Sequence, residues 1–131
     1  MRGTLAPTGM MTVRDVMSRD LVTLAPTATL AEAATVMGGR GIGSVLILEG
    51  GRLSGIFTER DVVRALAAHF DAAGHLAVDW MTRNPITIQA DATVKDALEV
   101  MLVRGFRHLP VMEEDTLVGV VSIRDLSQIA D

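Results

Sequence analysis

Two short segments of the sequence carry a glycine, a hydroxyl, an arginine and an aspartate at the same spacing. They are Gly55-Ile-Phe-Thr58-Glu-Arg60-Asp61 and Gly119-Val-Val-Ser122-Ile-Arg124-Asp125. If each segment joins a strand to a helix, the free backbone N–H groups, the hydroxyl and the arginine favour a bound phosphate. An aspartate one turn into the helix can accept two hydrogen bonds from a sugar such as ribose. The simpler alternative is that both hydroxyls and both aspartates only cap their helices.

A second candidate for phosphate binding is the basic segment 104–111, which contains Arg107 and His108. The corresponding segment of the first half of the chain keeps the leading arginine but has Gly43 and Ser44 at those two places. The alternative for the basic pair is a solvated turn. In either case the two halves of the chain are chemically unequal.

The composition excludes several classes of protein. The chain has 131 residues, a formal net charge of −4, 49% hydrophobic residues and no cysteine. These values are typical of a globular domain and exclude a disordered chain, disulfides and thiolate metal sites. The acidic balance and the 3% of aromatic residues disfavour nucleic-acid binding. No aliphatic run approaches the roughly 20 residues that span a membrane, and no secretory signal begins the chain, so we expect a cytoplasmic protein.

The sequence also lacks the usual residues of a catalytic or metal site. It contains no nucleophilic serine elbow, no Walker phosphate loop and no dinucleotide glycine fingerprint. The three histidines, His69, His75 and His108, lie in different segments with no carboxylate at metal-ligand spacing. We therefore expect a protein that is not an enzyme, with no catalytic residue, no metal site and no required cofactor.

The chain consists of two copies of one repeat. Residues 13–62 align with residues 77–126 at a constant offset of 64, with no gap and with 16 identities, against about three expected by chance from average composition. Two copies favour two pseudo-symmetric halves, because a solenoid needs at least three units. We assign the parts of the chain as a tail at 1–11, the first repeat at 12–70, a linker at 71–76 and the second repeat at 77–131.

Each repeat is predicted to have the order β-α-β-β-α. Capping-box spacing after Thr29 and Thr93 predicts the first helix of each repeat. Glycines end these helices, at Gly38-Gly39 and Gly41 in the first repeat and at Gly105 in the second. The last helix begins after Thr58 or Ser122. The predicted strands are 21–24, 44–49 and 53–57 in the first repeat and 85–88, 108–113 and 117–121 in the second, and a short helix is predicted over 75–81.

These features resemble the CBS domain pair, also called a Bateman module. The resemblance covers residues 12–127, and the second repeat is the closer match, because the first has Leu46 where Pro110 stands. It implies an α+β fold in which tandem repeats are related by pseudo-two-fold symmetry. The resemblance is carried by Asp15-Val-Met17-Ser, Asp79-Trp-Met81-Thr, Arg107-His-Leu-Pro-Val111 and the two Gly-x-x-Thr/Ser-x-x-Asp segments.

Modules of this kind bind adenosyl ligands in two clefts between the repeats. The resemblance implies that the aspartate of each cleft holds the ribose, that apolar side chains enclose the adenine and that the basic turn meets the phosphates. The first implied cleft consists of Thr58, Arg60, Asp61, Ile86, Thr87, Arg107 and His108. The second consists of Ser122, Arg124, Asp125, Val22, Thr23, Gly43 and Ser44. Because the basic pair serves only the first cleft in this assignment, Asp61→Ala is expected to weaken nucleotide binding more than Asp125→Ala.

The function that follows is that of a regulatory module sensing AMP, ADP or ATP, or else NAD or S-adenosylmethionine. The resemblance further implies a homodimer. Because the two repeats and short tails take up the whole 131 residues, the module is expected to act on a separate effector protein. The main alternative is a ligand-free structural or dimerisation module acting on a partner protein. A small enzyme or nucleic-acid binder is disfavoured, and the sequence selects neither the adenosyl ligand nor the regulated partner.

Overall fold

The computed structural model describes residues 11–68 and 71–129. These residues form two compact units. We call Val22–Pro85 the contiguous unit, and the described residues up to Leu21 together with those from Ile86 onward the terminal unit. Most of the expected N-terminal tail, 1–10, and His69 lie outside the described residues.

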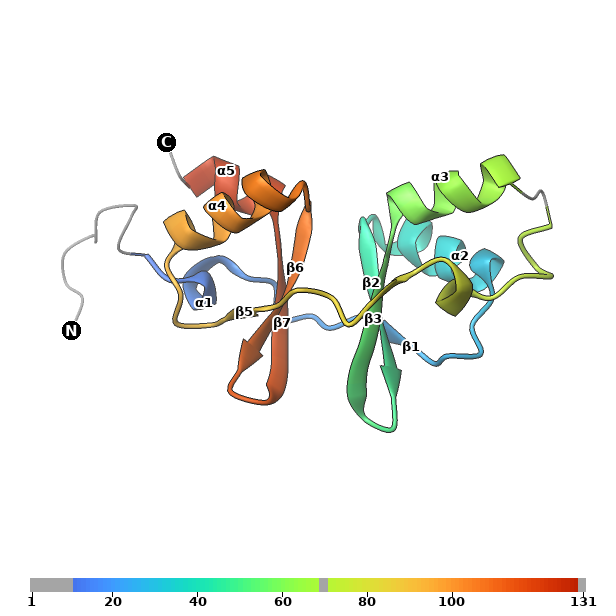
Figure 1. The fold of residues 1–131 in the computed structure, drawn as a ribbon, viewed down its shortest axis with the longest axis horizontal. Coiled ribbons are helices and arrows are strands. Elements are labelled where there is room, and N and C mark those ends of the chain that lie inside the picture. Colours follow the sequence, from blue (N-terminus) through green and yellow to red (C-terminus); the bar gives the residue numbers. More distant parts are fainter. Residues whose placement is uncertain (1–10, 69–70, 130–131) are drawn as a thin grey trace. The chain divides into compact units, whose positions relative to one another are not determined.

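The contiguous unit contains a four-stranded sheet with the order β1-β2-β3-β4, and two α-helices lie beside the sheet (Figure 1). The strand β1 is parallel to β2, whereas β2 with β3 and β3 with β4 are antiparallel pairs. In chain order its elements are β1 (Thr23–Leu24), α2 (Leu30–Arg40), β2 (Ser44–Glu49), β3 (Arg52–Thr58), α3 (Glu59–Ala68), the 3₁₀ helix η2 (Ala77–Asp79) and β4 (Thr82–Arg83).

The terminal unit repeats this plan with a three-stranded sheet of order β5-β6-β7. The strand β5 is parallel to β6, and β6 is antiparallel to β7. The elements are α1 (Val13–Val16), β5 (Ile88–Gln89), α4 (Val94–Arg104), β6 (His108–Glu113), β7 (Thr116–Ser122) and α5 (Ile123–Ile129). The predicted α+β class and the β-α-β-β-α order of each repeat are thus confirmed.

The predicted helix starts are confirmed by hydrogen bonds. The hydroxyl of Thr29 accepts from the Glu32 N–H at 3.0 Å, and the Glu32 carboxylate accepts from the Thr29 N–H at 2.8 Å, which completes a capping box. In the second repeat Asp96 replaces this glutamate, and only the bond from the Asp96 N–H to the Thr93 hydroxyl forms, at 3.0 Å. Threonine is therefore the helix start signal in both repeats.

The expected helix break at Gly38-Gly39 is wrong. The helix α2 continues through both glycines to Arg40 and ends at Gly41, which has a φ of +65°. The helix α4 ends in the same way at Gly105, with a φ of +75°. A left-handed residue closes each helix, and glycine adopts that conformation at little cost.

The central hairpins match the prediction, but the outer strands are shorter. The strands β2 and β6 have the bounds predicted for them, 44–49 and 108–113. The strand predicted over 21–24 is reduced to Thr23–Leu24. In place of the strand predicted over 85–88, the structure has Ile88–Gln89, which shares only Ile88 with the prediction. The short helix expected over 75–81 is the single 3₁₀ turn η2.

The compact units exchange segments between the sequence repeats. Met17, which precedes the first repeat's strands, packs in the core of the terminal unit, and Met81 of the second repeat packs in the core of the contiguous unit. A glycine receives each methionine: a Cβ added to Gly119 would lie 2.7 Å from the Ser18 carbonyl oxygen, and one added to Gly55 would lie 2.8 Å from that of Thr82. The glycines of the two motifs are therefore packing positions.

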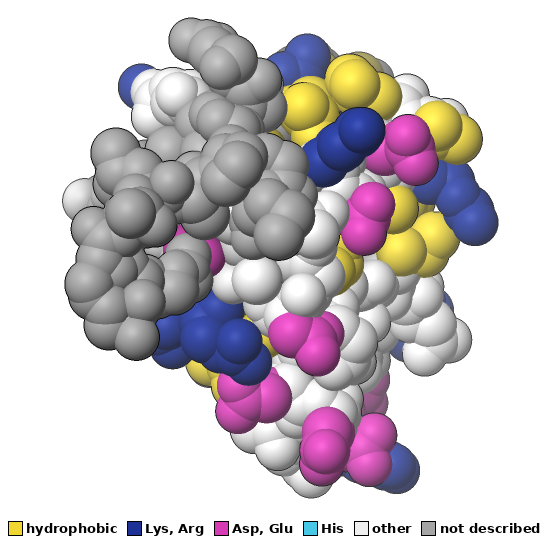
Figure 2. All heavy atoms as spheres, turned by 90° about the vertical axis from the view of Figure 1, so that its left-hand side faces the viewer, with side chains coloured by type: hydrophobic (Ala, Val, Ile, Leu, Met, Phe, Trp, Pro, Cys, Tyr) yellow, Lys and Arg dark blue, Asp and Glu magenta, His cyan; other side chains and the backbone are white. Residues whose placement is uncertain are grey.

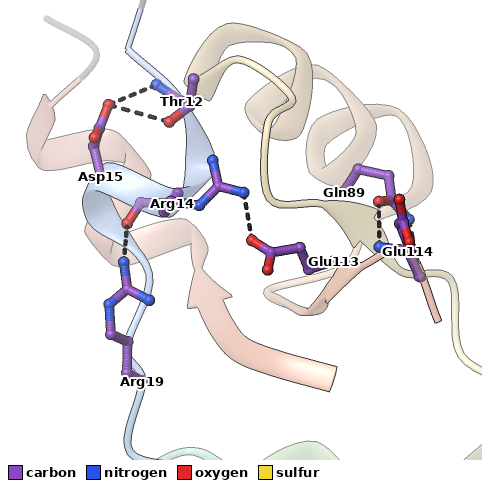
Figure 3. Close-up of polar contacts among 7 residues, drawn as sticks. All are labelled: Thr12, Arg14, Asp15, Arg19, Gln89, Glu113 and Glu114. Atoms are coloured by element: carbon purple, nitrogen blue, oxygen red, sulfur yellow. Dashed lines mark hydrogen bonds and ion pairs between the residues drawn. The ribbon is translucent and has the colours of Figure 1, made fainter. Parts of the chain in front are cut away.

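Polar contacts also fix the N-terminal segment to the terminal unit (Figure 3). The Arg14 guanidinium forms an ion pair of 2.6 Å with Glu113 on β6. The N–H of Val13 donates to the Ala92 carbonyl at 2.8 Å, and Ser18 and Val120 exchange backbone hydrogen bonds of 2.8 and 3.0 Å. Residues 12–18 thus pack on the second repeat's elements in the terminal unit.

Candidate functional site

One end of the sheet in the contiguous unit gathers the predicted site residues of the first repeat. Because β2 is parallel to β1 and antiparallel to β3, the starts of β1 and β2 lie at the same end as the final residue of β3. Ser44 is opposite Thr58, and the Leu46 N–H donates to the Val22 carbonyl at 3.1 Å. The helix α3 begins at this end of the sheet. The residues brought together are Val22, Thr23, Gly43, Ser44, Thr58, Arg60 and Asp61.

The Thr58–Asp61 turn is closed by its own hydrogen bonds. The Oδ2 atom of Asp61 accepts from the N–H of Thr58 at 2.9 Å and from its hydroxyl at 3.2 Å. The N–H of Asp61 donates back to the Thr58 hydroxyl at 3.4 Å. Asp61 is the buried charged residue of the described core, at 5% exposure. The capping alternative considered for the sequence therefore describes this turn as it stands.

Arg64 occupies the other oxygen of the same carboxylate. Its Nη1 atom lies 2.9 Å from Oδ1 of Asp61, and the side chain of Arg64 is 57% exposed, against 7% for that of Asp61. The Arg64 guanidinium also lies over the ring of Trp80, 5.7 Å from the centroid, where a cation is attracted by the π electrons. Neither Arg64 nor Trp80 was identified as a site residue from the sequence. The detectable feature was an arginine one helical turn beyond the motif aspartate.

The terminal unit places its own predicted residues at the equivalent end of its sheet. His108 begins β6 directly opposite Ser122, the last residue of β7. The carbonyl of Arg107 accepts from the Ile123 N–H at 2.8 Å. Ile86 and Thr87 immediately precede β5, which is parallel to β6, so they enter the sheet from this end. The basic pair therefore lies beside the Ser122–Asp125 turn of its own unit.

The Ser122–Asp125 turn is more open than its counterpart. The N–H of Asp125 donates to the Ser122 hydroxyl at 3.1 Å, which matches the backbone cap in the other unit. Among residues 11–68 and 71–129, no side chain or backbone group donates a hydrogen bond to the Asp125 carboxylate. Asp125 is half-buried, and Arg124 is exposed. The carboxylate keeps its acceptor capacity for another molecule.

The helix starts offer fewer backbone donors than the sequence suggested. In the contiguous unit the Glu59 N–H donates to the Gly43 carbonyl at 3.1 Å, as the Ile123 N–H does to Arg107 in the terminal unit. The N–H of each motif aspartate is also used, by the neighbouring hydroxyl. A phosphate would therefore depend more on side chains than on these amides.

Two sequence expectations join residues of different units. The pairing of Asp61 with Arg107 and His108, and that of Asp125 with Gly43 and Ser44, stay predictions. Inside each unit, the turn lies next to the other member of each expected pairing: Thr58 is opposite Ser44, and Ser122 is opposite His108.

The surface charge and the acidic side chains bear on other kinds of ligand. On the face drawn in Figure 2, acidic side chains lie among the basic ones. Within the part of the chain that the structure describes, no three His, Asp or Glu side chains come together as a metal site would require. Over the same residues, no helix has the length and apolar character needed to cross a membrane.

Comparison with known proteins gives a consistent family match. The family model of the CBS domain matches residues 13–68 and 76–130. A curated relative, an uncharacterized 17.7 kDa protein of Acidianus ambivalens, is 41% identical over 105 residues, which are 79% of this chain. The match covers 63% of that relative, so this chain spans less than two thirds of its length.

Two solved structures have the same fold. The CBS-domain containing protein ATU1752 from Agrobacterium tumefaciens is 34% identical, with a TM-score of 0.85 over 90% of this chain and 98% of that one. The CBS domain pair of protein MJ0100 is 28% identical, with a TM-score of 0.82 over 91% of this chain and 94% of that one. The latter was solved in complex with 5′-methylthioadenosine and S-adenosyl-L-methionine.

Proposed function

Because the chain belongs to the CBS domain family, we propose that it is a regulatory module that binds an adenosine-containing ligand through its two hydroxyl–aspartate turns. The observation that carries the proposal is the duplication of one arrangement. In both units a hydroxyl at the end of a strand accepts a bond from the N–H of an aspartate three residues later, beside the start of another strand. The same arrangement in both copies is compatible with one ligand class bound at both turns.

The acceptor chemistry of the turns favours an adenosine ligand. A carboxylate can accept the hydrogen bonds of a ribose diol, and the Asp125 carboxylate accepts none from the residues that the structure describes. Arg107 and His108 lie beside Ser122 and supply donors for an anionic or polar tail. The MJ0100 domain pair, whose solved complex contains two adenosine compounds, supports the same ligand class.

Regulation requires that the ligand bind two conformations with different affinities. The proposed output is therefore a change in shape or rigidity that an effector protein detects, and no chemical step is needed. We extend the proposal to self-association, because the large apolar side chains of Val63, Leu102 and Val103 are 67%, 65% and 77% exposed. Sedimentation that shows only a monomer would remove this extension and leave the ligand proposal intact.

The ligand proposal is tested by mass spectrometry of small molecules that co-purify with the protein, followed by thermal unfolding with 5′-methylthioadenosine, AMP, ATP and S-adenosylmethionine. Binding only to the folded state raises its stability by about 2.7 kcal/mol at a ligand concentration of about 100 Kd. We expect a higher Tm with at least one of these compounds. The double variant Asp61→Ala/Asp125→Ala should lose the shift.

A matched control removes two exposed carboxylates outside the turns. Asp91 and Asp115 are exposed, and the variant Asp91→Ala/Asp115→Ala should keep the full ligand-induced shift. No shift with any compound contradicts the proposal. A shift that survives in the Asp61→Ala/Asp125→Ala variant places the ligand elsewhere.

One observation favours the ligand-free assembly module as a second candidate. The Thr58–Asp61 turn satisfies its own hydrogen bonds, as a purely structural cap would. If both turns are only caps, the aspartate variants lower the stability of the protein, and nucleotides do not change the Tm of the wild type or of the variants. The same thermal measurements therefore separate the two candidates.

A further inference from the structure

We propose that Arg64 makes the two turns unequal, so that the Ser122–Asp125 turn binds an adenosine ligand more tightly than the Thr58–Asp61 turn while Arg64 is paired with Asp61. The inference rests on the proposed function, because it concerns the order in which two sites of one ligand class are filled. It assigns to Arg64 a role outside the motif itself.

Most acceptor positions of the Asp61 carboxylate are already occupied. Two carboxylate oxygens offer about four lone-pair positions. The Thr58 N–H and hydroxyl use two of them on Oδ2, and Arg64 uses one on Oδ1. A ribose diol needs two acceptors, so it must displace at least one of these bonds. Arg64 is the most displaceable donor, because its side chain is 57% exposed and can return to water.

Arg64 has a second contact besides Asp61, the ring of Trp80. Trp80 follows η2 and belongs to the same unit as Arg64. Its ring lies 5.7 Å from the guanidinium carbon, and this attraction favours the same Arg64 position that bonds to Asp61. The ion pair and the ring contact thus act on the same side chain.

The terminal unit has a glutamine at the position equivalent to Arg64. At the offset of 64 that relates the repeats, Gln128 corresponds to Arg64, and Val16 corresponds to Trp80. Gln128 is exposed. The Asp125 carboxylate accepts no hydrogen bond from the described part of the chain, so it can accept both hydroxyls without losing a bond. This order is the opposite of the one expected from the sequence.

The experiment measures each turn alone by calorimetry with 5′-methylthioadenosine, which is neutral and therefore insensitive to the loss of a distant positive charge. Asp125→Ala leaves only the Thr58–Asp61 turn, and Asp61→Ala leaves only the Ser122–Asp125 turn. We expect Asp125→Ala to weaken binding more than Asp61→Ala. Adding Arg64→Gln to Asp125→Ala should strengthen the remaining site about tenfold, the value of one charge-assisted hydrogen bond.

A reciprocal exchange tests the same idea in the other unit. Gln128→Arg in the Asp61→Ala background should weaken binding severalfold, and less than tenfold because no tryptophan holds the new arginine. Arg52→Gln removes an exposed arginine at the hairpin end of β3 and serves as the charge control. It should leave binding in the Asp125→Ala background unchanged. Circular dichroism and Trp80 emission check that each variant is folded.

The outcomes separate this inference from the proposed function. If the wild type binds the ligand and Asp61→Ala lowers the affinity more than Asp125→Ala does, the inference is wrong and the proposed function stands. The inference also fails if Arg64→Gln leaves the remaining site unchanged or weaker. If the wild type binds neither 5′-methylthioadenosine nor AMP, both the inference and the proposed function are wrong.

Discussion

The Thr58–Asp61 and Ser122–Asp125 turns have the same backbone arrangement and different carboxylate contacts. In each turn the hydroxyl accepts from the aspartate N–H, at 3.4 Å and 3.1 Å. The N–H of the residue after the hydroxyl, Glu59 or Ile123, donates to a carbonyl just before the neighbouring strand. Among the described residues, an arginine bonds to the carboxylate of the first turn and none bonds to that of the second. The difference lies three residues beyond the motif, so a repeated motif alone does not imply two equal sites.

One packing contact of the scaffold is the same in the two units, although their sheets have four and three strands. Gly55 with Met81 and Gly119 with Met17 form the same close contact in each core. The duplication has therefore kept the packing that positions the turns, whereas the side chains around the carboxylates have diverged. Mutations at this contact should affect both units alike, and mutations around the turns should not.

The largest effect is expected from filling the methionine contacts. Gly55→Ala and Gly119→Ala each place a methyl group within 2.8 Å of a backbone carbonyl oxygen that cannot rotate away, and such overpacking costs about 2–3 kcal/mol. Urea unfolding should show a similar loss for both. The control Gly39→Ala lies in α2 with nothing within 4 Å of the new Cβ, and it should be neutral or stabilising by up to ~1 kcal/mol. Unequal losses would contradict the equality of the two packing contacts.

The next effect compares the two aspartates in the absence of ligand. Asp61→Ala removes three hydrogen bonds to a buried carboxylate, and we expect it to lower the free energy of unfolding by about 2 kcal/mol. Asp125→Ala removes a carboxylate that accepts none from the described residues, so its loss should stay under about 0.5 kcal/mol. If urea unfolding shows equal losses of unfolding free energy for the two variants, the two carboxylates contribute equally to stability.

Much of the fold was predictable because it depends on local patterns. The threonine caps, the closing glycines Gly41 and Gly105 and the central hairpins follow from residues within a few positions of each other. The helix α1 has a local signal that was missed, the capping box of Thr12 and Asp15, on a helix of only four residues. The strand β4 was not predicted, because it is two residues long and forms by pairing with β3. The same long-range exchange puts Met17 and Met81 in cores that the repeat boundaries do not suggest.

The candidate site was predictable in its residue types and not in its internal contacts. The motif identified Thr58, Asp61, Ser122 and Asp125 because their spacing is local. Arg64 has two contacts, a local one with Asp61 and a distant one with Trp80. The second could not be predicted, because Trp80 is 16 positions farther along the sequence and is brought to the helix only by the fold. Arg64 and its counterpart Gln128 also lie just beyond the aligned residues 13–62 and 77–126, so the comparison of the repeats did not include them.

A smaller effect distinguishes the two capping hydroxyls. Thr58 accepts from the Asp61 N–H and donates to the Asp61 carboxylate, whereas Ser122 accepts from the Asp125 N–H only. Loss of an N-cap hydroxyl costs about 1 kcal/mol, so Thr58→Ala should reach that value and Ser122→Ala should cost less. The matched replacements Thr58→Ser and Ser122→Thr keep the hydroxyl and should recover most of the stability. A larger loss at Ser122 would reverse the comparison.

The smallest effect concerns a contact that only the terminal unit contains. Arg14 and Glu113 form an ion pair of 2.6 Å between side chains that are 39% and 55% exposed, and at the position equivalent to Arg14 the contiguous unit has Val78. Exposed pairs of this kind contribute about 0.2–1 kcal/mol, since water already solvates both charges. A double-mutant cycle with Arg14→Ala and Glu113→Ala should therefore give a coupling near the lower value, and added salt should reduce it. A coupling above about 1 kcal/mol would show that this pair fixes the N-terminal segment, and the backbone bonds of Val13 and Ser18 would then be secondary.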